Sequence, residues 1–253
     1  MNVITTKAFV MKSFPWKERH KLLHLLTPEL GLITALAPAS ERMKSDIRGA
    51  TQLFSLSEFV LTEKQGRYSV RSAFVIESFV PFYNDFERLT AVSHASEVFT
   101  DVARHDEPNR TLFDLWAYSV YEISVSEYPV FIARMATLRL MVEIGLTPYL
   151  DSCVRCHSHV NVPYRFSFSE GGLLCEREEF RQTQAELTIL SPDALALLRH
   201  IATAPHKKLF RFYASSNTRS EASDFADRWL EERMEKRYNR LAFLDENSTF
   251  LID

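Results

Sequence analysis

The sequence predicts an α+β protein of several domains, in which a small N-terminal β-barrel precedes an all-α domain that carries a cysteine-containing insertion. Three observations support this fold class. Residues 4–80 alternate between apolar and polar side chains, as strands do. Beyond residue 80 the apolar positions recur every three or four residues, as in helices. Residues 150–180 follow neither period and contain all three cysteines of the chain.

The composition is that of a folded chain in water. Of the 253 residues, 46% are hydrophobic and 25% are charged, which is typical of globular proteins and excludes a disordered chain. No apolar run approaches the ~18 residues that span a bilayer, and residues 1–21 lack the apolar core of a signal peptide. Three cysteines are too few for a disulfide framework. We therefore expect a cytoplasmic protein.

Five strands are expected in the first 80 residues, at 5–14, 21–26, 32–38, 52–62 and 68–78. A proline and a glycine lie in the turn at 27–31, and Gly66 stands at the tight point of a hairpin at 63–67. Five strands within about 75 residues, with no helical segment between them, favour a small Greek-key barrel.

Helices are expected at 86–102, 111–126 and 129–145, from residue 191 onward, and at 220–237. The Ser-Pro-Asp sequence at 191–193 supplies an N-cap, a proline at the first helical position and an acid in the first turn. Arg134 and Arg139 lie on an apolar helix, so we expect them to be inward-facing and ion-paired. The apolar stripe of the first helix is expected in the core and includes Phe86, Leu89 and Phe99.

These patterns predict four segments: a barrel at 1–80, a first helical part at 81–152, a cysteine module at 153–180 and a second helical part at 181–253. The net charge of −3 is unevenly spread over them. Residues 1–80 contain 11 lysines and arginines against 7 acids, a net charge of +4, so the remainder carries −7. A basic segment suits an anionic partner. An excess this small is also ordinary scatter, so charge alone does not predict nucleic-acid binding.

The cysteines have the spacing of a zinc ribbon with one ligand replaced. Cys153 and Cys156 form a CxxC pair, and Cys175 follows 19 residues later. A second CxxC pair would end at position 178, where Glu178 stands. Two such turns about 15–20 residues apart present four thiolates to one tetrahedral zinc ion. Three of the four ligands are therefore present, in a zinc-ribbon-like module with a hairpin at 163–169.

The fourth position leaves several alternatives open. Glu178 has the right spacing, and carboxylates do bind zinc. His157 directly follows Cys156, and adjacent residues seldom face one ion, whereas His159 could reach it from a loop. Equally, the module could lack a metal and be held by its apolar residues, which are Phe166, Phe168 and Leu173. Cysteines in CxxC turns are ligands more often than nucleophiles, so a hydrolase that uses Cys175 is disfavoured.

Three segments together resemble the bacterial recombination mediator family RecO. The first is GLITA at 31–35, followed by SERMKS at 40–45 and by Gly49, Gln52, Phe54 and Ser55. The second is IGLTPYLDSCVRC at 144–156, and the third is FSFSEGGLLC at 166–175. Their order and spacing cover nearly the whole chain. The sequence departs from the family's four-cysteine form at Glu178, and at His157, where a glycine is usual.

The resemblance implies an OB-fold barrel, a helical domain and a zinc module with one structural zinc. It also implies binding of single- and double-stranded DNA, annealing of complementary strands and a complex with RecR. Contact with the tail of single-stranded-DNA-binding protein, whose displacement lets recombinase load, is implied as well. The implied site of action is the cytoplasm, at the nucleoid and not at a membrane. Some family members lack the cysteines, so the departure at Glu178 bears on the metal and not on the family.

An OB barrel binds a nucleic-acid strand with a cationic groove and with exposed aromatic side chains that stack on bases. The loop between the first two strands supplies Trp16, Lys17, Arg19 and Lys21, and the loop at 39–49 supplies Arg42, Lys44 and Arg48. We expect these seven residues to contact DNA with little sequence preference, because none forms a base-reading set. Alternatively, Trp16 caps the open end of the barrel, and the cations are ordinary loop charges.

The chain contains no glycine-rich phosphate loop, no HExxH and no GxSxG, so we expect no enzymatic activity. The competing hypothesis is a protein–protein adaptor whose OB barrel no longer binds nucleic acid.

Overall fold

The computed structural model describes residues 2–17, 20–38, 47–79, 81–105, 107–179, 187–241 and 244. The chain divides into two compact units, of which the first is Met1–Val130 with Arg240–Asp253 and the second is Phe131–Asn239. The four segments predicted at 1–80, 81–152, 153–180 and 181–253 stay predictions. None of the helices that the structure describes has both the length and the apolarity needed to cross a bilayer.

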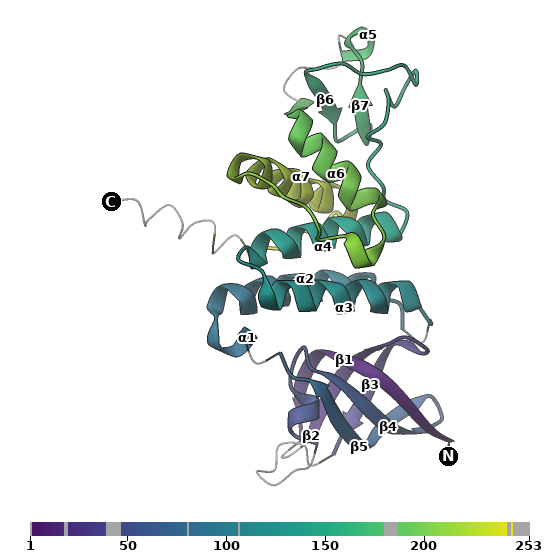
Figure 1. The fold of residues 1–253 in the computed structure, drawn as a ribbon. Coiled ribbons are helices and arrows are strands. Elements are labelled where there is room, and N and C mark those ends of the chain that lie inside the picture. Colours follow the sequence, from purple (N-terminus) through teal and green to yellow (C-terminus); the bar gives the residue numbers. More distant parts are fainter. Residues whose placement is uncertain are drawn as a thin grey trace. The chain divides into compact units, whose positions relative to one another are not determined.

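The first unit begins with a closed five-stranded barrel (Figure 1). Its strands are β1 (Asn2–Trp16), β2 (His20–Thr27), β3 (Gly31–Ala37), β4 (Leu56–Lys64) and β5 (Arg67–Glu77). They follow one another in the order β1-β2-β3-β5-β4, and β1 also pairs with β4. Only the β3–β5 pair is parallel. The predicted small barrel is therefore confirmed, with the five-stranded arrangement of an OB fold.

The barrel core is built from alternate residues of β1 to β4, which is why their register is well defined, and from Val70 and Ala73 of β5, which lie on either side of a register shift. The short 3-10 helix η1 (Gly49–Thr51) contacts β4 and β5 and adds Ala50 to this core. The strand residues of the core are small or branched, apart from one phenylalanine: Ala8, Val10, Leu23, Leu25, Ile33, Ala35, Ala37, Phe59, Leu61, Val70 and Ala73.

The predicted β4–β5 hairpin is confirmed, and its turn has the expected backbone. Lys64 pairs with Arg67, so only Gln65 and Gly66 form the turn. Both have positive φ, 53° and 74°. This is the type I′ geometry, whose twist matches that of the flanking strands and which suits glycine at the second position.

Two strand limits differ from the predicted ones. β1 continues through Pro15 to Trp16, beyond the predicted end at residue 14. Here β1 pairs with β2 on one side only, because its pairing with β4 runs from Asn2 to Phe9. A proline, which lacks an N–H, is tolerated on such a free edge. β4 begins at Leu56 and not at residue 52, because η1 and the turn after it occupy residues 49–54.

Among the described residues, the helices α1 (Pro81–Asn84), α2 (Phe86–Val102) and α3 (Arg110–Val125) follow the barrel in the first unit. The Ser96 hydroxyl of α2 donates a hydrogen bond to the Met11 carbonyl of β1 at 3.0 Å. The Phe9 ring lies 6.3 Å from the Trp116 ring of α3. These contacts hold the two helices against the barrel, and Figure 1 shows both helices next to its strands.

The predicted core stripe of α2 is correct for Phe99 and wrong for Phe86. Phe99 is fully buried, whereas Phe86 is 61% exposed. Phe82 of α1 is buried instead and stacks on Phe79 with 5.6 Å between ring centroids. Phe86 directly follows the N-cap residue Asp85. Its place at the core is taken by the preceding turn, which helical periodicity alone does not reveal.

The second unit combines helices with a three-stranded sheet. Its helices are α4 (Pro129–Glu143), α5 (Glu176–Glu179), α6 (Pro192–Thr203), α7 (Ser216–Met234) and the 3-10 helix η3 (His206–Lys208). The sheet has the order β7-β6-β8, from β6 (Tyr164–Ser167), β7 (Gly172–Leu174) and β8 (Leu187–Leu190). A helical domain with a small cysteine-containing insertion was predicted and is confirmed.

An aromatic cluster joins the sheet to α7. The Phe166 ring lies 4.8 Å from the Phe225 ring and 5.8 Å from the Trp229 ring. Arg134 and Arg139 of α4 are buried and ion-paired with Asp227 and Glu143 respectively, at 2.9 and 2.7 Å. The prediction that both arginines are structural is therefore confirmed.

Candidate nucleic-acid interface and metal centre

Strand pairing brings the β1–β2 turn to the end of β3. Trp16 pairs with His20, and Lys21 pairs with both Pro15 on β1 and Ala37 on β3. Lys17 follows Trp16 with a positive φ of 53°, which turns the chain. Because Ala37 is the last residue of β3, the connection that carries the second set of predicted residues leaves the barrel beside Lys21.

Side chains at this end point to two different faces. Lys21 shares a face of β2 with the core residues Leu23 and Leu25, so it lies at the mouth of the barrel. Trp16 and Phe14 lie on the outer face of β1 and are 47% and 45% exposed. Trp16 therefore does not share a face with Lys21, although the two residues lie at the same strand end.

Phe14 was not among the predicted residues. It lies two positions before Trp16 on the same strand, and residues so spaced share a strand face, so the sequence contained a signal for it. Cross-strand partners share a face, so Leu22, opposite Phe14, and His20, opposite Trp16, extend the outer surface. The Phe14 ring meets the His24 ring edge-on at 5.4 Å. This surface continues the outer side of β2, the strand face that OB folds use to bind oligonucleotides.

His24 marks where this surface is covered by other parts of the first unit. Its ring lies 5.9 Å from that of His105, in the chain that follows α2. Burial lowers the pKa of His24, and the nearby His105 and Lys12 lower it further. His24 is therefore favoured in its neutral form, while Phe14 and Trp16 are open to solvent.

Three of the predicted DNA-binding cations lie among the residues that the structure describes, and all three have solvent access. Lys17 and Arg48 are exposed, and Lys21 is half-buried. Arg48 directly precedes η1. Within the described part of the chain, no ion pair involves Lys17, Lys21 or Arg48. The other predicted DNA-binding residues lie outside the described residues; they are Arg19, Arg42 and Lys44.

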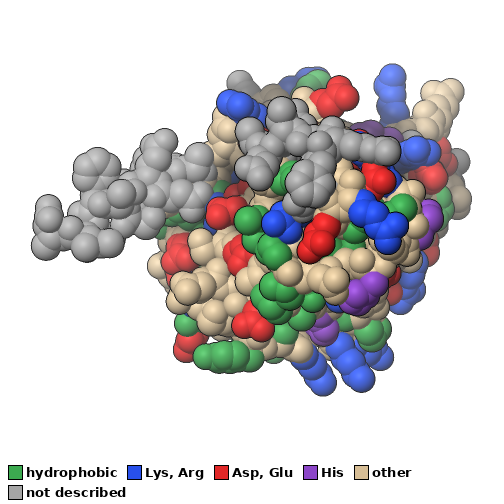
Figure 2. All heavy atoms as spheres, turned by 90° about the horizontal axis from the view of Figure 1, so that it is seen from above, with side chains coloured by type: hydrophobic (Ala, Val, Ile, Leu, Met, Phe, Trp, Pro, Cys, Tyr) green, Lys and Arg blue, Asp and Glu red, His purple; other side chains and the backbone are tan. Residues whose placement is uncertain are grey.

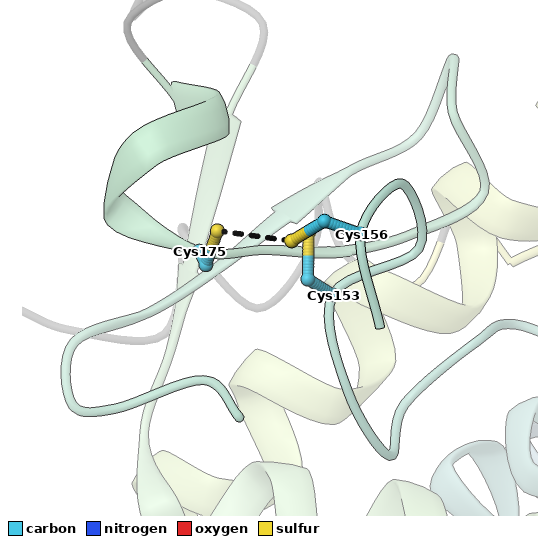
Figure 3. A group of neighbouring side chains, drawn as sticks. All are labelled: Cys153, Cys156 and Cys175. Atoms are coloured by element: carbon cyan, nitrogen blue, oxygen red, sulfur yellow. Dashed lines mark hydrogen bonds between the residues drawn. The ribbon is translucent and has the colours of Figure 1, made fainter. Parts of the chain in front are cut away.

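The three cysteines of the second unit lie together (Figure 3). Their sulfur atoms are all within 4.8 Å of one another, and the Sγ atoms of Cys156 and Cys175 are 3.6 Å apart. Cys153 and Cys175 are buried and Cys156 is exposed. Hydrogen bonds, chiefly from Ser158 and then from the other two cysteines, lower the pKa of Cys156 to about 7. Cys156 therefore favours its thiolate, the form that binds metals.

A backbone hydrogen bond closes each cysteine turn, over four residues in the first turn and over three in the second. The His157 N–H donates to the Cys153 carbonyl at 2.9 Å, and the Glu178 N–H donates to the Cys175 carbonyl at 2.9 Å. His157 has a positive φ of 57°, which explains why glycine suits this position. Gly172 lets the first turn approach β7, because a Cβ atom there would lie 2.7 Å from that of Val154.

The Glu178 side chain is bound by Arg155. The Arg155 guanidinium lies 3.3 Å from a Glu178 carboxylate oxygen and 2.7 Å from one of Glu170. We call these three residues the arginine clasp. The clasp joins the CxxC turn to the β6–β7 turn and to α5. Glu178 thus stands at the predicted spacing, but the metal-binding group found among the described residues contains the three cysteines alone.

The two histidines considered as ligands lie in different surroundings. The His157 Nδ1 atom is 3.4 Å from the Tyr149 hydroxyl. His159 lines a cavity of about 310 Å³ together with Cys175, Arg165 and Arg177. Seen from this end of the second unit, Lys and Arg side chains are interspersed with Asp and Glu over the described part of the surface (Figure 2).

Comparisons with known proteins agree along nearly the whole chain. The family model "Recombination protein O N terminal" matches residues 1–79, and "Recombination protein O C terminal" matches residues 83–242. The DNA repair protein RecO of Acetivibrio thermocellus is 33% identical over 245 residues, 96% of this chain and 97% of that protein. RecO of Alkaliphilus metalliredigens is 32% identical, with 69% and 72% covered. RecO of Caldanaerobacter subterraneus is 26% identical, with 93% and 94% covered.

Proposed function

Because the chain belongs to the RecO family of DNA repair and recombination proteins, we propose that it is a non-catalytic recombination mediator. In this proposal it binds single- and double-stranded DNA and anneals complementary single strands. With RecR, it helps load recombinase at gaps covered by single-stranded-DNA-binding protein, whose tail it contacts. It acts in the cytoplasm, at the nucleoid.

The observation that best supports DNA binding is the combination of side chains at the β1–β2 end of the barrel. Phe14 and Trp16 are exposed on the outer face of β1, and Lys17 and Lys21, which form no ion pair with any described residue, lie at the same strand end. Exposed aromatic rings stack on bases, and nearby cations neutralise phosphates. Arg19, Arg42, Lys44 and Arg48 are proposed to extend the same interface along the two loops.

The test is fluorescence anisotropy of a labelled oligothymidine at several salt concentrations. We expect the logarithm of the association constant to fall linearly with the logarithm of salt concentration, because each neutralised phosphate releases counterions. Absence of binding at low salt would reject the proposal and favour a protein–protein adaptor. Pull-down of RecR, and of a peptide with the tail sequence of single-stranded-DNA-binding protein, tests the protein partners separately.

Variants locate the interface. Replacing Lys17, Lys21 and Arg48 together by alanine should make the salt slope shallower by about 2, at roughly 0.7 per phosphate on a single strand. Arg42→Ala with Lys44→Ala should also weaken binding and flatten the slope. Trp16→Ala should weaken binding about tenfold at every salt concentration with an unchanged slope, because stacking involves no counterion. Trp16→Phe is the matched control, and an unaffected affinity in Trp16→Ala would place the strand elsewhere.

We further propose that Cys153, Cys156 and Cys175 hold one structural zinc ion. Zinc–sulfur bonds of about 2.3 Å in a tetrahedron imply sulfur atoms about 3.8 Å apart. The 3.6 Å between Cys156 and Cys175 fits this spacing. Glu178 is the fourth protein ligand of the proposal, which requires it to leave Arg155.

Elemental analysis of protein purified without chelator tests the zinc proposal. One zinc per chain is expected, with loss in Cys153→Ser and retention in the exposed control Asn161→Ala. Glu178→Gln should weaken zinc binding if the carboxylate is a ligand. A zinc content well below one per chain in the unaltered protein would instead support a module held by its apolar residues and by the arginine clasp.

A further inference from the structure

The connection between α6 and α7 carries a set of exposed side chains that the proposed barrel interface does not use. Lys207, Lys208 and Arg211 are exposed, and Tyr213 is 95% exposed. All four lie within seven residues of the second unit. We call these four residues the α6–α7 surface. A fully exposed tyrosine among cations is unusual for a residue whose ring normally finds apolar contacts.

Buried groups hold the backbone of this connection in place. An Arg139 guanidinium nitrogen donates hydrogen bonds to the Ile201 and Ala204 carbonyls at 3.0 and 2.6 Å. The Nε2 atom of His206 lies 2.9 Å from a Glu143 carboxylate oxygen. Arg139 and Glu143 are paired on α4. The η3 turn that presents Lys207 and Lys208 is therefore fastened to the helix beneath it.

Apolar contacts fasten the segment that carries Arg211 and Tyr213. Leu209 is fully buried, and His200 lies 3.1 Å from its carbonyl oxygen. The Phe212 ring meets the Phe131 ring of α4 edge-on at 5.9 Å. Anchors on both sides of Arg211 leave its side chain and that of Tyr213 to solvent. The surface is thus preorganised, which reduces the entropy lost when a ligand binds.

The charges of the surface are not neutralised locally. Among the described residues, no ion pair involves Lys207, Lys208 or Arg211. α7 begins directly after this segment, with Ser215 as its N-cap and no acid in its first turn. The amino end of a helix adds to a positive potential. Cations beside an exposed aromatic ring are the arrangement by which proteins bind single strands without sequence preference.

We propose that the α6–α7 surface is a second contact for single-stranded DNA, separate from the barrel interface. The inference rests on the proposed function and deepens it, because annealing requires that two strands be held by the protein. Lys207, Lys208 and Arg211 contact phosphates, and Tyr213 stacks on a base. Each unit of the chain thus supplies one strand contact.

The first measurement is the binding stoichiometry of an oligothymidine of about 12 nucleotides, close to the length that one OB barrel covers. At low salt and protein concentrations well above the dissociation constant, the unaltered protein should bind two oligonucleotides per chain. Lys207→Ala with Lys208→Ala should bind one. The matched control, Arg177→Ala with Arg237→Ala, removes two other exposed charges of the same unit and should still bind two.

The second measurement is the annealing rate of two complementary labelled oligonucleotides. The Lys207→Ala and Lys208→Ala variant should anneal about tenfold more slowly, from the loss of two phosphate contacts. Tyr213→Ala should also slow annealing, and Tyr213→Phe should restore it because the ring remains. The melting temperatures of the two variants are the control. If Tyr213 had only a structural role, two variants with equal melting temperatures would anneal at the same rate.

The outcomes separate the two proposals. If the unaltered protein binds no oligonucleotide, the proposed function fails. If it binds one, and the lysine variant binds and anneals as the unaltered protein does, the α6–α7 surface is rejected and the proposed function stands. If the lysine variant loses all binding, this surface is confirmed as a strand contact and the barrel interface is rejected.

Discussion

Arg155 stands within the CxxC turn, yet its guanidinium binds two carboxylates from other parts of the module. Glu170, and then Glu178, raise the pKa of Arg155 further above its ordinary value. A planar guanidinium can bind both acids at once, whereas an ammonium group is a single point charge. The single side chain of Arg155 therefore connects three segments of the fold.

We predict that Arg155→Ala loosens the cysteine module. The melting temperature should fall by a few degrees, and the Val154 amide, which donates to Leu173, should exchange its hydrogen faster. Arg155→Lys should have an intermediate effect. Arg177→Ala removes a charge one residue from Glu178 and serves as the control. Equal exchange rates in Arg155→Ala and Arg177→Ala would show that the clasp contributes nothing.

The positive φ of His157 gives a second prediction at this scale. A residue other than glycine loses about 1 kcal/mol in the left-handed conformation, and β-branched residues lose more. His157→Gly should therefore raise the free energy of unfolding by up to about 1 kcal/mol. His157→Val should lower it. Urea denaturation of both variants checks the order, and a more stable valine variant would contradict it.

Sequence patterns located some of these residues and could not locate others. The CxxC spacing predicted that the cysteines come together, because a tight turn fixes the positions of both cysteines of the pair. The Arg155–Glu178 contact joins positions 23 residues apart, and no local rule describes it. Spacing alone therefore suggested Glu178 as a zinc ligand. Trp16 was predicted as part of a loop, because the strand was expected to end at residue 14. The strand face that Trp16 shares with Phe14 was therefore not recognised, and Phe14 was missed.

At the scale of elements, the start of α6 was the best-defined prediction. The Ser191 hydroxyl oxygen accepts a hydrogen bond from the Ala194 N–H at 3.1 Å, with Pro192 at the first helical position. Ser191→Ala should lower the free energy of unfolding by about 1 kcal/mol, because a helix amide loses its partner. Ser191→Asp should preserve stability. Chemical denaturation of both variants tests this, and equal losses would argue against capping.

Long elements were predicted better than short ones, for a physical reason. α2, α3 and α4 each run for at least 15 residues, so their periodicity is clear. β8 has four residues and exists because it pairs with β6, whose residues lie at least 20 positions earlier in the chain. α7 begins at Ser216 and not at residue 220, because Ser215 caps it with a hydrogen bond from Thr218. A polar first turn has no apolar period to reveal it.

Considered as a whole molecule, the chain should lose stability in mild acid. Burial, His105 and Lys12 lower the pKa of His24 in the folded state below the value near 6.5 expected when unfolded. The folded state then binds fewer protons, so its stability is full above pH about 6.5. Stability falls as the pH drops below this value towards the folded pKa. His24→Leu should flatten this dependence.

Thermal unfolding between pH 5 and 8 measures the effect. His20→Leu is the control, because His20 lies on the same strand and face. If the two variants and the unaltered protein share one pH dependence, His24 is not its source. The cysteine cluster lies in the second unit and is identical in all three proteins, so it does not affect the comparison between them.

Two sets of contacts connect the turns of the cysteine module, the cysteine cluster and the arginine clasp, and in the zinc proposal a bound metal takes Glu178 from the clasp. A module with two alternative sets of contacts remains folded when one of them is lost. If zinc is bound as proposed, we therefore expect the zinc-free protein, in which Arg155 binds Glu178, still to fold with the contact between the Phe166 and Trp229 rings intact. Removal of the metal alone, or of Arg155 alone, should lower the stability of the module only slightly. Removal of both should unfold the module, so the two effects should be synergistic.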